Sequence, residues 1–194
     1  MEQKELKITF CSGAGSVTGA NFLIEGEGKK FLVDCGLEQG TSVADQTNWS
    51  SFSYDPGEID ILFITHAHID HIGRIPKLIH EGFKGRIIST DDTLELVRPM
   101  LEDTIRILSH ENDEIKAMYT EGNVDKAISL WEGVPYHQNI NIDHGFKMQF
   151  LDSGHILGSA MLEIIYNNKK IVFTGDLGNS PSPLLRDTEK ISGV

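Results

Sequence analysis

Alternating apolar and polar residues over the first third of the chain predict β-strands. The alternation runs through Leu6, Ile8 and Phe10, and apolar runs return within residues 21–25 and 30–34 after glycine-rich turns. Period-two patterns between turn sequences are typical of antiparallel strands joined by short connections. We therefore expect the chain to begin as a β-meander.

A long polar segment and a buried strand come next. Residues 36–57 are rich in Gly, Ser, Asn and Thr, and we expect a surface loop pinned by Trp49, Phe52 and Tyr54. Residues 59–65 form a nearly continuous apolar run of strand length. Such a run suits a strand covered on both faces in a layered fold.

Helical spacing dominates the middle of the chain. Residues 73–81 have apolar positions three and four apart, with Pro76 near the first turn, where proline is tolerated. Residues 91–132 carry mainly helix-forming residues with the same period, and the pattern predicts breaks near Pro99 and Gly122.

Strand patterns flank and follow this helical region. They lie at 86–89, 135–142, 146–152, 159–166 and 170–174. Strands on both sides of a helical segment predict an α/β fold in which two sheets carry helices on their outer faces.

Size and charge narrow the possible classes of protein. The 194 residues suit one domain, and 39% apolar residues are enough for a core. The formal charge is 17 − 29 = −12, which excludes a protein that holds nucleic acid through a broadly basic surface. No apolar run is long enough to cross a bilayer and no signal peptide begins the chain, so we expect a cytoplasmic protein without a membrane partner. Cys11 and Cys35 are expected to be reduced thiols.

The segment from Thr65 to His71 carries the chemistry. It holds His66, His68, Asp70 and His71 directly after the predicted buried strand. In extended backbone, residues two apart point the same way, so His66 and His68 can face one metal ion. A turn directly afterwards would direct Asp70 and His71 to a second ion. Imidazole and carboxylate ligands favour Zn²⁺, with Mn²⁺ and Fe²⁺ left open.

Three more candidates stand at other strand ends. His155 follows a glycine at a strand boundary, and Asp176 comes directly after a buried strand and Gly175, where its carboxylate can bridge two cations. Asp34 also ends a strand. We assign Asp34 to orienting a ligand or the loop backbone, because metal-bound histidines generally need a partner for their other ring nitrogen.

These motifs resemble the metallo-β-lactamase superfamily, whose signature is H-x-H-x-D-H followed by a later His and a later Asp. Within it, the chain is most similar to the β-CASP branch of RNA-processing nucleases. The similar segments lie at 14–25, 33–40, 65–78, 153–164 and 173–179.

The resemblance implies an αββα sandwich and a pair of zinc ions. It places His66, His68 and His155 on one zinc and Asp70 and His71 on the other, with Asp176 bridging. It further implies that the intact enzyme cleaves RNA phosphodiester bonds with a metal-bound hydroxide, and that Asp70 or Asp176 accepts a proton.

The resemblance also predicts what this chain lacks. Members of the branch carry an inserted β-CASP domain and a further metal-binding His after the Asp176 motif, whereas this sequence ends at Val194. We therefore expect residues 1–194 to be the N-terminal portion of a metallo-β-lactamase domain, with a partial sandwich and a weakened second zinc site.

Two other functions remain open from the sequence. The same residues would serve a stand-alone hydrolase of small esters, thioesters or lactones, since fold does not fix substrate. A non-catalytic, metal-stabilised module would instead bind a partner chain, or self-associate, through its incomplete face. We expect no ligand role for the remaining histidines, His80, His110, His137 and His144. Ser153 and Ser159 are open as phosphate contacts, although serine in such turns usually only shapes the turn.

Overall fold

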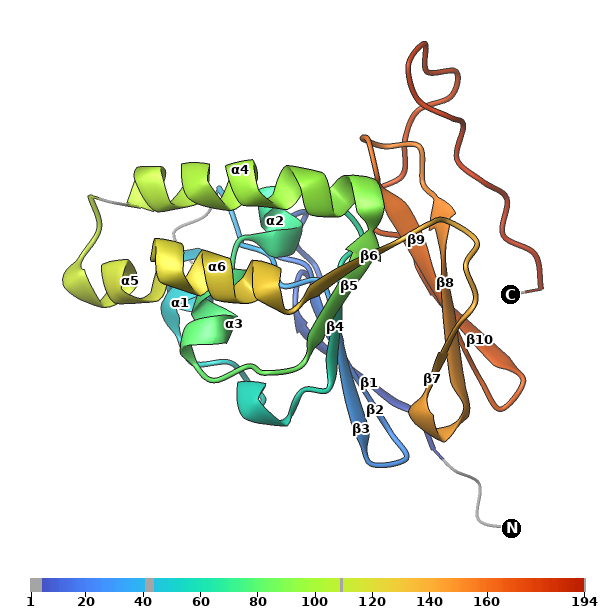
Figure 1. The fold of residues 1–194 in the computed structure, drawn as a ribbon, viewed down its shortest axis with the longest axis horizontal. Helices are drawn as coiled ribbons and strands as arrows, with labels where there is room; N and C mark the ends of the chain where they lie inside the picture. Colours follow the sequence, from blue (N-terminus) through green and yellow to red (C-terminus); the bar gives the residue numbers. More distant parts are fainter. Residues whose placement is uncertain (1–4, 41–43, 109, 194) are drawn as a thin grey trace.

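Two β-sheets stack face to face, and helices cover the outer face of the larger sheet (Figure 1). The computed structural model describes residues 5–40, 44–108 and 110–193. Its layers are helices, six strands and four strands. The α/β fold predicted from the sequence is confirmed. Three of the four layers of the implied αββα sandwich are present. The fourth is absent from the described residues, since no described helix covers the outer face of the smaller sheet.

The larger sheet has the strand order β1-β2-β3-β4-β5-β6. The first three strands pair antiparallel, which confirms the predicted meander, and the last three add in parallel. The strands are β1 (Lys7–Ser12), β2 (Asn21–Gly26), β3 (Lys29–Val33), β4 (Ile61–Phe63), β5 (Arg86–Thr90) and β6 (Trp131–Val134). Because parallel strands share one direction, the carboxyl ends of β3, β4 and β5 meet at one edge of the sheet.

The smaller sheet is fully antiparallel, in the order β10-β9-β8-β7. Its strands are β7 (Ile140–Ile142), β8 (Phe146–Asp152), β9 (Ala160–Tyr166) and β10 (Lys169–Phe173). The predicted strand at 135–142 is wrong in its first half. Strand β6 ends before it, at Val134, and Pro135 begins the connection to the second sheet. The sequence pattern also missed β6, which pairs in parallel with β5 and is tied to it by the Trp131 Nε1–H···Oγ bond to Ser89, 2.9 Å.

The helices lie together on the first sheet (Figure 1). They are α1 (Ala44–Trp49), α2 (Ile69–Ile72), α3 (Ile75–His80), α4 (Asp91–Leu108), α5 (Asp113–Met118) and α6 (Glu121–Ser129), with short 3₁₀ turns at Pro56–Glu58 and Asp143–Gly145. The helix predicted within 73–81 is confirmed.

Of the two predicted helix breaks, the one near Pro99 is wrong and the one near Gly122 is confirmed. Helix α4 continues through Pro99, whose side chain is exposed. Helix α5 ends at Met118 and α6 begins at Glu121, where the Thr120 hydroxyl oxygen caps the first turn by accepting from the Asn123 N–H.

The long loop predicted at 36–57 contains helix α1. Asn48 anchors this helix: its amide oxygen accepts from the Glu38 N–H and its amide nitrogen donates to the Glu38 carbonyl, both at 2.8 Å. The ring of Trp49 packs edge-on against Tyr119 at 5.8 Å. These contacts are distant in sequence, which explains why a local pattern without apolar periodicity gave no sign of the helix.

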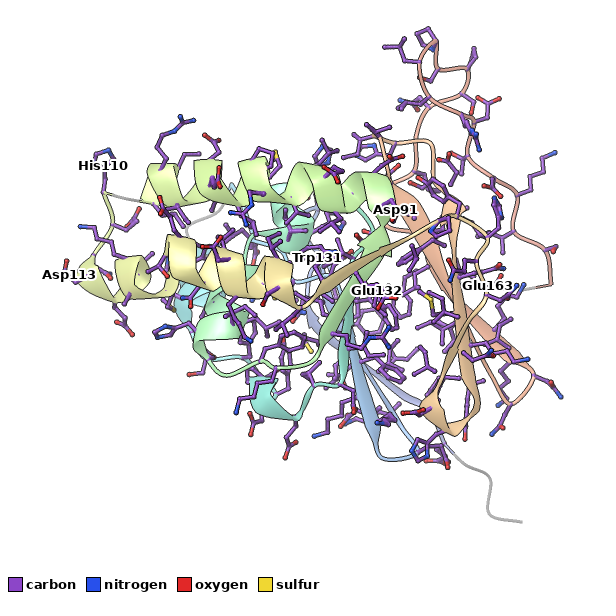
Figure 2. All side chains as sticks on the ribbon, in the orientation of Figure 1. Asp91, His110, Asp113, Trp131, Glu132 and Glu163 are labelled. Carbon is purple, nitrogen blue, oxygen red and sulfur yellow. The ribbon has the colours of Figure 1, made fainter. Side chains whose placement is uncertain are left out.

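Aromatic rings fill the space between the sheets. Phe31 on β3 is fully buried and meets Phe63 on β4 and Phe146 on β8, with ring centres 6.0 and 5.0 Å apart. Figure 2 shows side chains filling the space between the layers, with Trp131 where the helical layer meets the first sheet. No described helix is long and apolar enough to cross a membrane.

Replacing Phe31 by alanine tests this inter-sheet core. We expect the free energy of unfolding to fall by about 3–5 kcal/mol, because a buried ring is lost and a cavity remains. Phe10→Ala is the control. Phe10 is 64% exposed, so its loss should cost about 1 kcal/mol or less. Urea unfolding of both variants measures the difference, and equal losses would contradict this description of the core.

Candidate metal centre

Side chains from four separate segments converge beyond the ends of the strands. His66 and His68 follow β4, Asp70 and His71 lie in α2, and the other two come from the smaller sheet: His155 from the β8–β9 connection and Asp176 from the end of β10. The structure thus brings together all six residues that the sequence indicated as metal ligands. They form two groups that share Asp176.

The first group is a set of three imidazoles. His66 Nε2 lies 3.0 Å from His68 Nδ1, and His155 Nε2 lies 3.2 Å from the same His68 atom. His66 is fully buried. His68 precedes α2 with extended backbone angles, φ −69° and ψ 147°, so its ring leaves the chain on the side of His66 before the helix begins.

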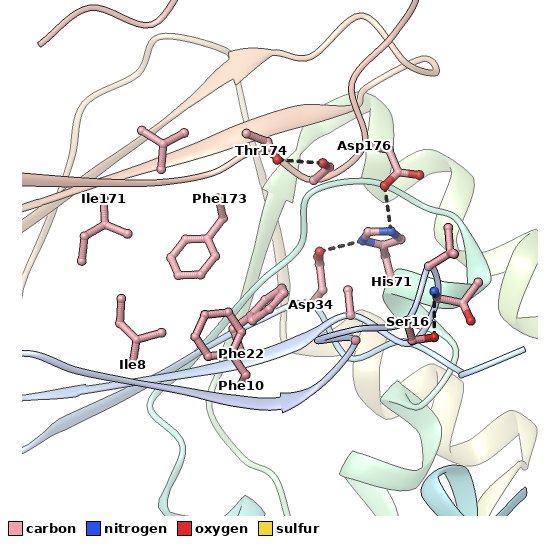
Figure 3. Close-up of a pocket in the computed structure, with 16 residues that line it drawn as sticks. Ile8, Phe10, Ser16, Phe22, Asp34, His71, Ile171, Phe173, Thr174 and Asp176 are labelled. Carbon is pink, nitrogen blue, oxygen red and sulfur yellow. Dashed lines mark hydrogen bonds and ion pairs between the residues drawn. The ribbon is translucent and has the colours of Figure 1, made fainter. Parts of the chain in front are cut away.

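Asp176 joins this group to the second one. Its Oδ2 lies 3.9 Å from His66 Nε2 and 3.5 Å from His155 Nε2. Its Oδ1 lies 3.5 Å from His71 Nε2, an ion-pair contact drawn in Figure 3. Asp70 Oδ2 lies 3.7 Å from the same His71 nitrogen. The two oxygens of one carboxylate therefore face different groups, as in a bridging ligand.

Asp34 contacts the His71 ring of the second group at Nδ1, the nitrogen that does not face Asp70 and Asp176. Its Oδ2 accepts from His71 Nδ1–H at 2.7 Å and from the Thr65 hydroxyl at 2.8 Å, and its Oδ1 accepts from the Thr65 N–H at 2.8 Å. Because Nδ1 of His71 carries the shared proton, Nε2 keeps its lone pair toward Asp70 and Asp176. Asp34 has a φ of +57°, a left-handed conformation that is uncommon outside glycine and that clusters at functional sites.

The electrostatics of the two groups differ. Burial, together with the neighbouring imidazoles His71, His68 and His155, lowers the pKa of His66 to about 2. Burial and then His155 also lower the pKa of His68. For His71, burial acts to lower the pKa, but the charge of Asp34 and its hydrogen bond outweigh burial and the pKa is raised.

This donor set fits a bound cation. At neutral pH the His66 ring is uncharged. Each of the close nitrogen pairs, His66–His68 and His68–His155, has room for at most one proton between its two atoms, so unprotonated ring nitrogens point their lone pairs toward the same space. Converging lone pairs beside a carboxylate repel one another unless a positive charge lies among them. Ligand atoms at about 2.0–2.2 Å from one tetrahedral ion lie about 3.3–3.6 Å apart. The nitrogen–nitrogen and nitrogen–oxygen contacts within the two groups are close to this separation, at 3.0 to 3.9 Å.

The turn that carries His155 is built by Ser159. Its hydroxyl oxygen accepts from the N–H groups of His155 and Ile156 at 3.0 and 3.1 Å. Ser159 is fully buried. Of the two roles left open for it, the structure shows the shaping of the turn. The hydroxyl of Ser153 is buried and has no hydrogen-bond partner among the described residues.

The two cysteines and two turn lysines lie outside the two groups. Cys35 is a buried free thiol whose pKa burial raises to about 11, and Cys11 is also free. The turn lysines Lys29 and Lys30 pair with Asp60 and Glu58 respectively. The sequence analysis gave no role to Thr65, although its hydroxyl links Asp34 to the His66 ring, 3.1 Å away. The alternation that placed His66 and His68 on one side gave no signal for Thr65.

An apolar cleft of about 390 Å³ opens beside the second group (Figure 3). It runs between the edge strands β1 and β10, and His71 and Asp176 lie at one end of it. Phe10, Phe22 and Phe173 line it, with neighbouring ring centres 5.5 Å apart. The cleft lies where β1 and β10, the edge strands of the two sheets, come near each other.

The sequence of the chain matches one described family. Residues 15–191 match the metallo-beta-lactamase superfamily. The match includes every residue of the two groups and Asp34.

Several curated proteins are similar to the chain. "Ribonuclease TTHA0252" of Thermus thermophilus is 31% identical over 182 residues, covering 94% of this chain and 40% of the relative. "Cleavage and polyadenylation specificity factor 73" of Drosophila melanogaster is 34% identical over 166 residues, covering 84% and 24%. "Probable RNase MJ4" of Methanocaldococcus jannaschii is 30% identical over 191 residues, covering 97% and 41%. The chain thus spans less than half the length of these relatives.

Solved structures agree on the fold. A protein of unknown function from Enterococcus faecalis matches with a TM-score of 0.63 and 15% identity, over 90% of this chain and 44% of that one. The metallo-beta-lactamase fold protein YhfI from Bacillus subtilis matches with a TM-score of 0.54 and 18% identity, over 90% and 63%. At these identities the likeness concerns the fold alone.

Replacing Gly36 by alanine should disturb the second group. A Cβ atom on Gly36 would lie 1.6 Å from the Asp70 carbonyl oxygen, so the Asp70 backbone must move and stability should fall by about 1–3 kcal/mol or more. Gly122→Ala is the matched control, since its Cβ meets nothing closer than 3.9 Å in a helix, where alanine is favoured by about 1 kcal/mol. Opposite shifts in the urea midpoint are expected. A neutral Gly36→Ala would contradict the tight packing.

Proposed function

Because the chain belongs to the metallo-β-lactamase superfamily, we propose that it supplies the metal centre of a zinc-dependent ribonuclease. The resemblance to RNA-processing nucleases is confirmed by relatives whose names include ribonuclease and cleavage factor. The activity itself is proposed for the intact protein. Residues 1–194 would be the N-terminal portion of its metallo-β-lactamase domain.

One observation carries this proposal, namely the sharing of the Asp176 carboxylate between two groups of donors. A structural metal site needs a single closed shell of ligands. Two adjacent groups with a common carboxylate instead suit a pair of ions, an arrangement that recurs in enzymes that hydrolyse phosphodiesters.

We assign His66, His68, His155 and Asp176 to one zinc, and Asp70, His71 and Asp176 to the other. Imidazole with carboxylate favours Zn²⁺ among the first-row ions. Bound there, the two ions would lower the pKa of a water molecule and neutralise charge on a phosphate. The second group offers fewer side chains than the first, and we propose that it binds its ion more weakly.

The remaining chemistry falls to the protein groups. Asp34 holds the His71 ring in the tautomer that leaves Nε2 free, and the Thr65 hydroxyl holds His66 in the same manner through Nδ1. Asp70 and Asp176 carry the carboxylates nearest to the Nε2 atom of His71, at 3.7 and 3.5 Å. We propose one of them as the acceptor of the proton that the attacking water gives up.

Metal analysis tests the two-ion assignment. Wild-type protein freed of metal by chelator and reloaded with Zn²⁺ should hold two ions per chain, the second released first on dialysis. His66→Ala should lose the first site and His71→Ala the second, while His144→Ala, outside both groups, should match the wild type. Elemental analysis gives the ratio, and retention of two ions by both variants would refute the assignment.

Hydrolysis assays test the substrate. RNA, a generic phosphodiester and a thioester should be offered side by side to the intact protein, and we expect it to cleave RNA in a reaction that chelator abolishes. Asp176→Asn should lower the rate at least roughly a hundredfold, since charge stabilisation by metal ions supplies several kcal/mol. Cleavage of RNA that survives chelator would rule out the proposal, whereas activity on the thioester alone would favour the small-ester hydrolase.

The open cleft favours one further role for the same chain. Phe10 is 64% exposed, and no described strand pairs with the outer edge of β10 beside the same cleft, a combination that favours pairing with another polypeptide. We propose that the chain on its own self-associates through this face. Light scattering should show a mass that rises with concentration, and Phe10→Lys should restore the monomer. A wild-type monomer at high concentration would contradict the proposal.

A further inference from the structure

Arg74 is a buried cation that the proposed chemistry does not use. It lies between α2 and α3, is only 4% exposed, and forms no ion pair with any described carboxylate. Burying a charge without an ion-pair partner costs desolvation free energy, so the hydrogen bonds of the Arg74 side chain must offset that cost. Its guanidinium also lies over the ring of Phe52, 5.4 Å from the ring centre.

The guanidinium connects two loops. Its Nε–H donates to the Gly36 carbonyl at 2.6 Å, and its Nη2–H donates to the Ser12 hydroxyl oxygen at 2.5 Å. Ser12 in turn donates to the Gly19 carbonyl at 2.6 Å, across the base of the glycine-rich β1–β2 loop. One planar fork therefore ties the end of that loop to the segment that follows Asp34.

These two loops donate hydrogen bonds to the backbone carbonyls of Asp70 and His71 in the second metal group. The Ala20 N–H donates to the Asp70 carbonyl at 2.9 Å, and the Cys35 N–H donates to the His71 carbonyl at 2.8 Å. The Gly36 N–H closes the set by donating to the Ala20 carbonyl at 2.9 Å. No hydrogen bond of the Arg74 side chain reaches the segments that carry His66, His68 or His155.

We propose that Arg74 is a positioning residue for the second metal group alone. Resting on the proposed metal centre, the inference is that its fork fixes Asp70 and His71 relative to Asp34, and so sets the affinity of the weaker site. The rigid plane of the guanidinium holds its N–H donors in fixed directions, which lets one side chain bond both loops at once. A lysine keeps the charge but cannot reproduce the fork.

Lys77 offers a matched control. It is fully buried on α3, three residues after Arg74, and its Nζ lies over the same Phe52 ring at 3.8 Å. It donates to the Ser50 carbonyl at 2.7 Å and pairs with Glu81 at 2.8 Å, away from both site loops. Replacing either cation removes a buried charge near Phe52, but only Arg74 contacts the loops that hold Asp70 and His71.

The experiment titrates Zn²⁺ into metal-free wild type, Arg74→Met, Arg74→Lys and Lys77→Met by calorimetry. For both Arg74 variants we expect the second ion to bind roughly ten- to a hundredfold more weakly, with the first unchanged. Lys77→Met should bind both ions as wild type does, even if its stability falls. Amide exchange in the metal-free protein should quicken at Ala20 and Gly36 in the Arg74 variants only.

Each of the other outcomes would contradict either the role of the Arg74 fork or the proposed function. Equal weakening of both ions, or equal effects of Lys77→Met, would show a general loss of structure and overturn the inference. Wild-type affinity in Arg74→Lys would show that charge, not the fork, is what matters. A wild type that binds no Zn²⁺ at all would instead refute the proposed function, and the exchange rates at Ala20 and Gly36 would still report whether Arg74 positions this backbone.

Discussion

The carboxylate of Asp34 is the point on which the site depends. It lies at the end of β3, 1% exposed, and accepts three hydrogen bonds: two from Thr65 at the end of β4 and one from His71 in α2. A buried carboxylate is costly unless such donors surround it. The three bonds therefore lock two neighbouring strand ends and the following helix into one arrangement, and the orientation of the His71 ring follows from it.

Around this anchor, the two groups are built by different means. The first group joins the sheets: His66 follows β4 of the larger sheet, while His155 sits on the β8–β9 connection of the smaller one. The backbone bond from the Ala160 N–H to the Thr65 carbonyl, 2.8 Å, ties the two sheets together beside the site. Asp70 and His71 of the second group lie on one short helix, α2, which depends on the loops around it because four residues cannot hold a helix alone.

The sequence was informative where the period of a pattern matched the geometry of the chain. The spacing of His66 and His68 followed from extended backbone, and the meander followed from alternation. The pattern could not predict that α4 continues through Pro99, because the exposure of that position depends on how the helix packs. The role of Arg74 could not be predicted either. Its partners lie 38 and 62 residues away along the chain and are a carbonyl and a hydroxyl, groups that leave no sequence signal. His155 and Asp176 were indicated by their positions at strand ends, and the family resemblance assigned them to particular ions, since nothing local links them to His66.

The difference in construction bears on how the two halves of the site respond to disturbance. The first half is held by strand pairing and by the inter-sheet core, so a change that leaves the sheets intact leaves His66 near His155. The second half is held by single hydrogen bonds between loops, with Gly36 packed directly on the Asp70 carbonyl. The apolar cleft ends at this half, next to His71 and Asp176. A polypeptide or domain seated along the β10 edge would therefore reach His71 of the second group and Asp176, which both groups share, before it reached the other ligands.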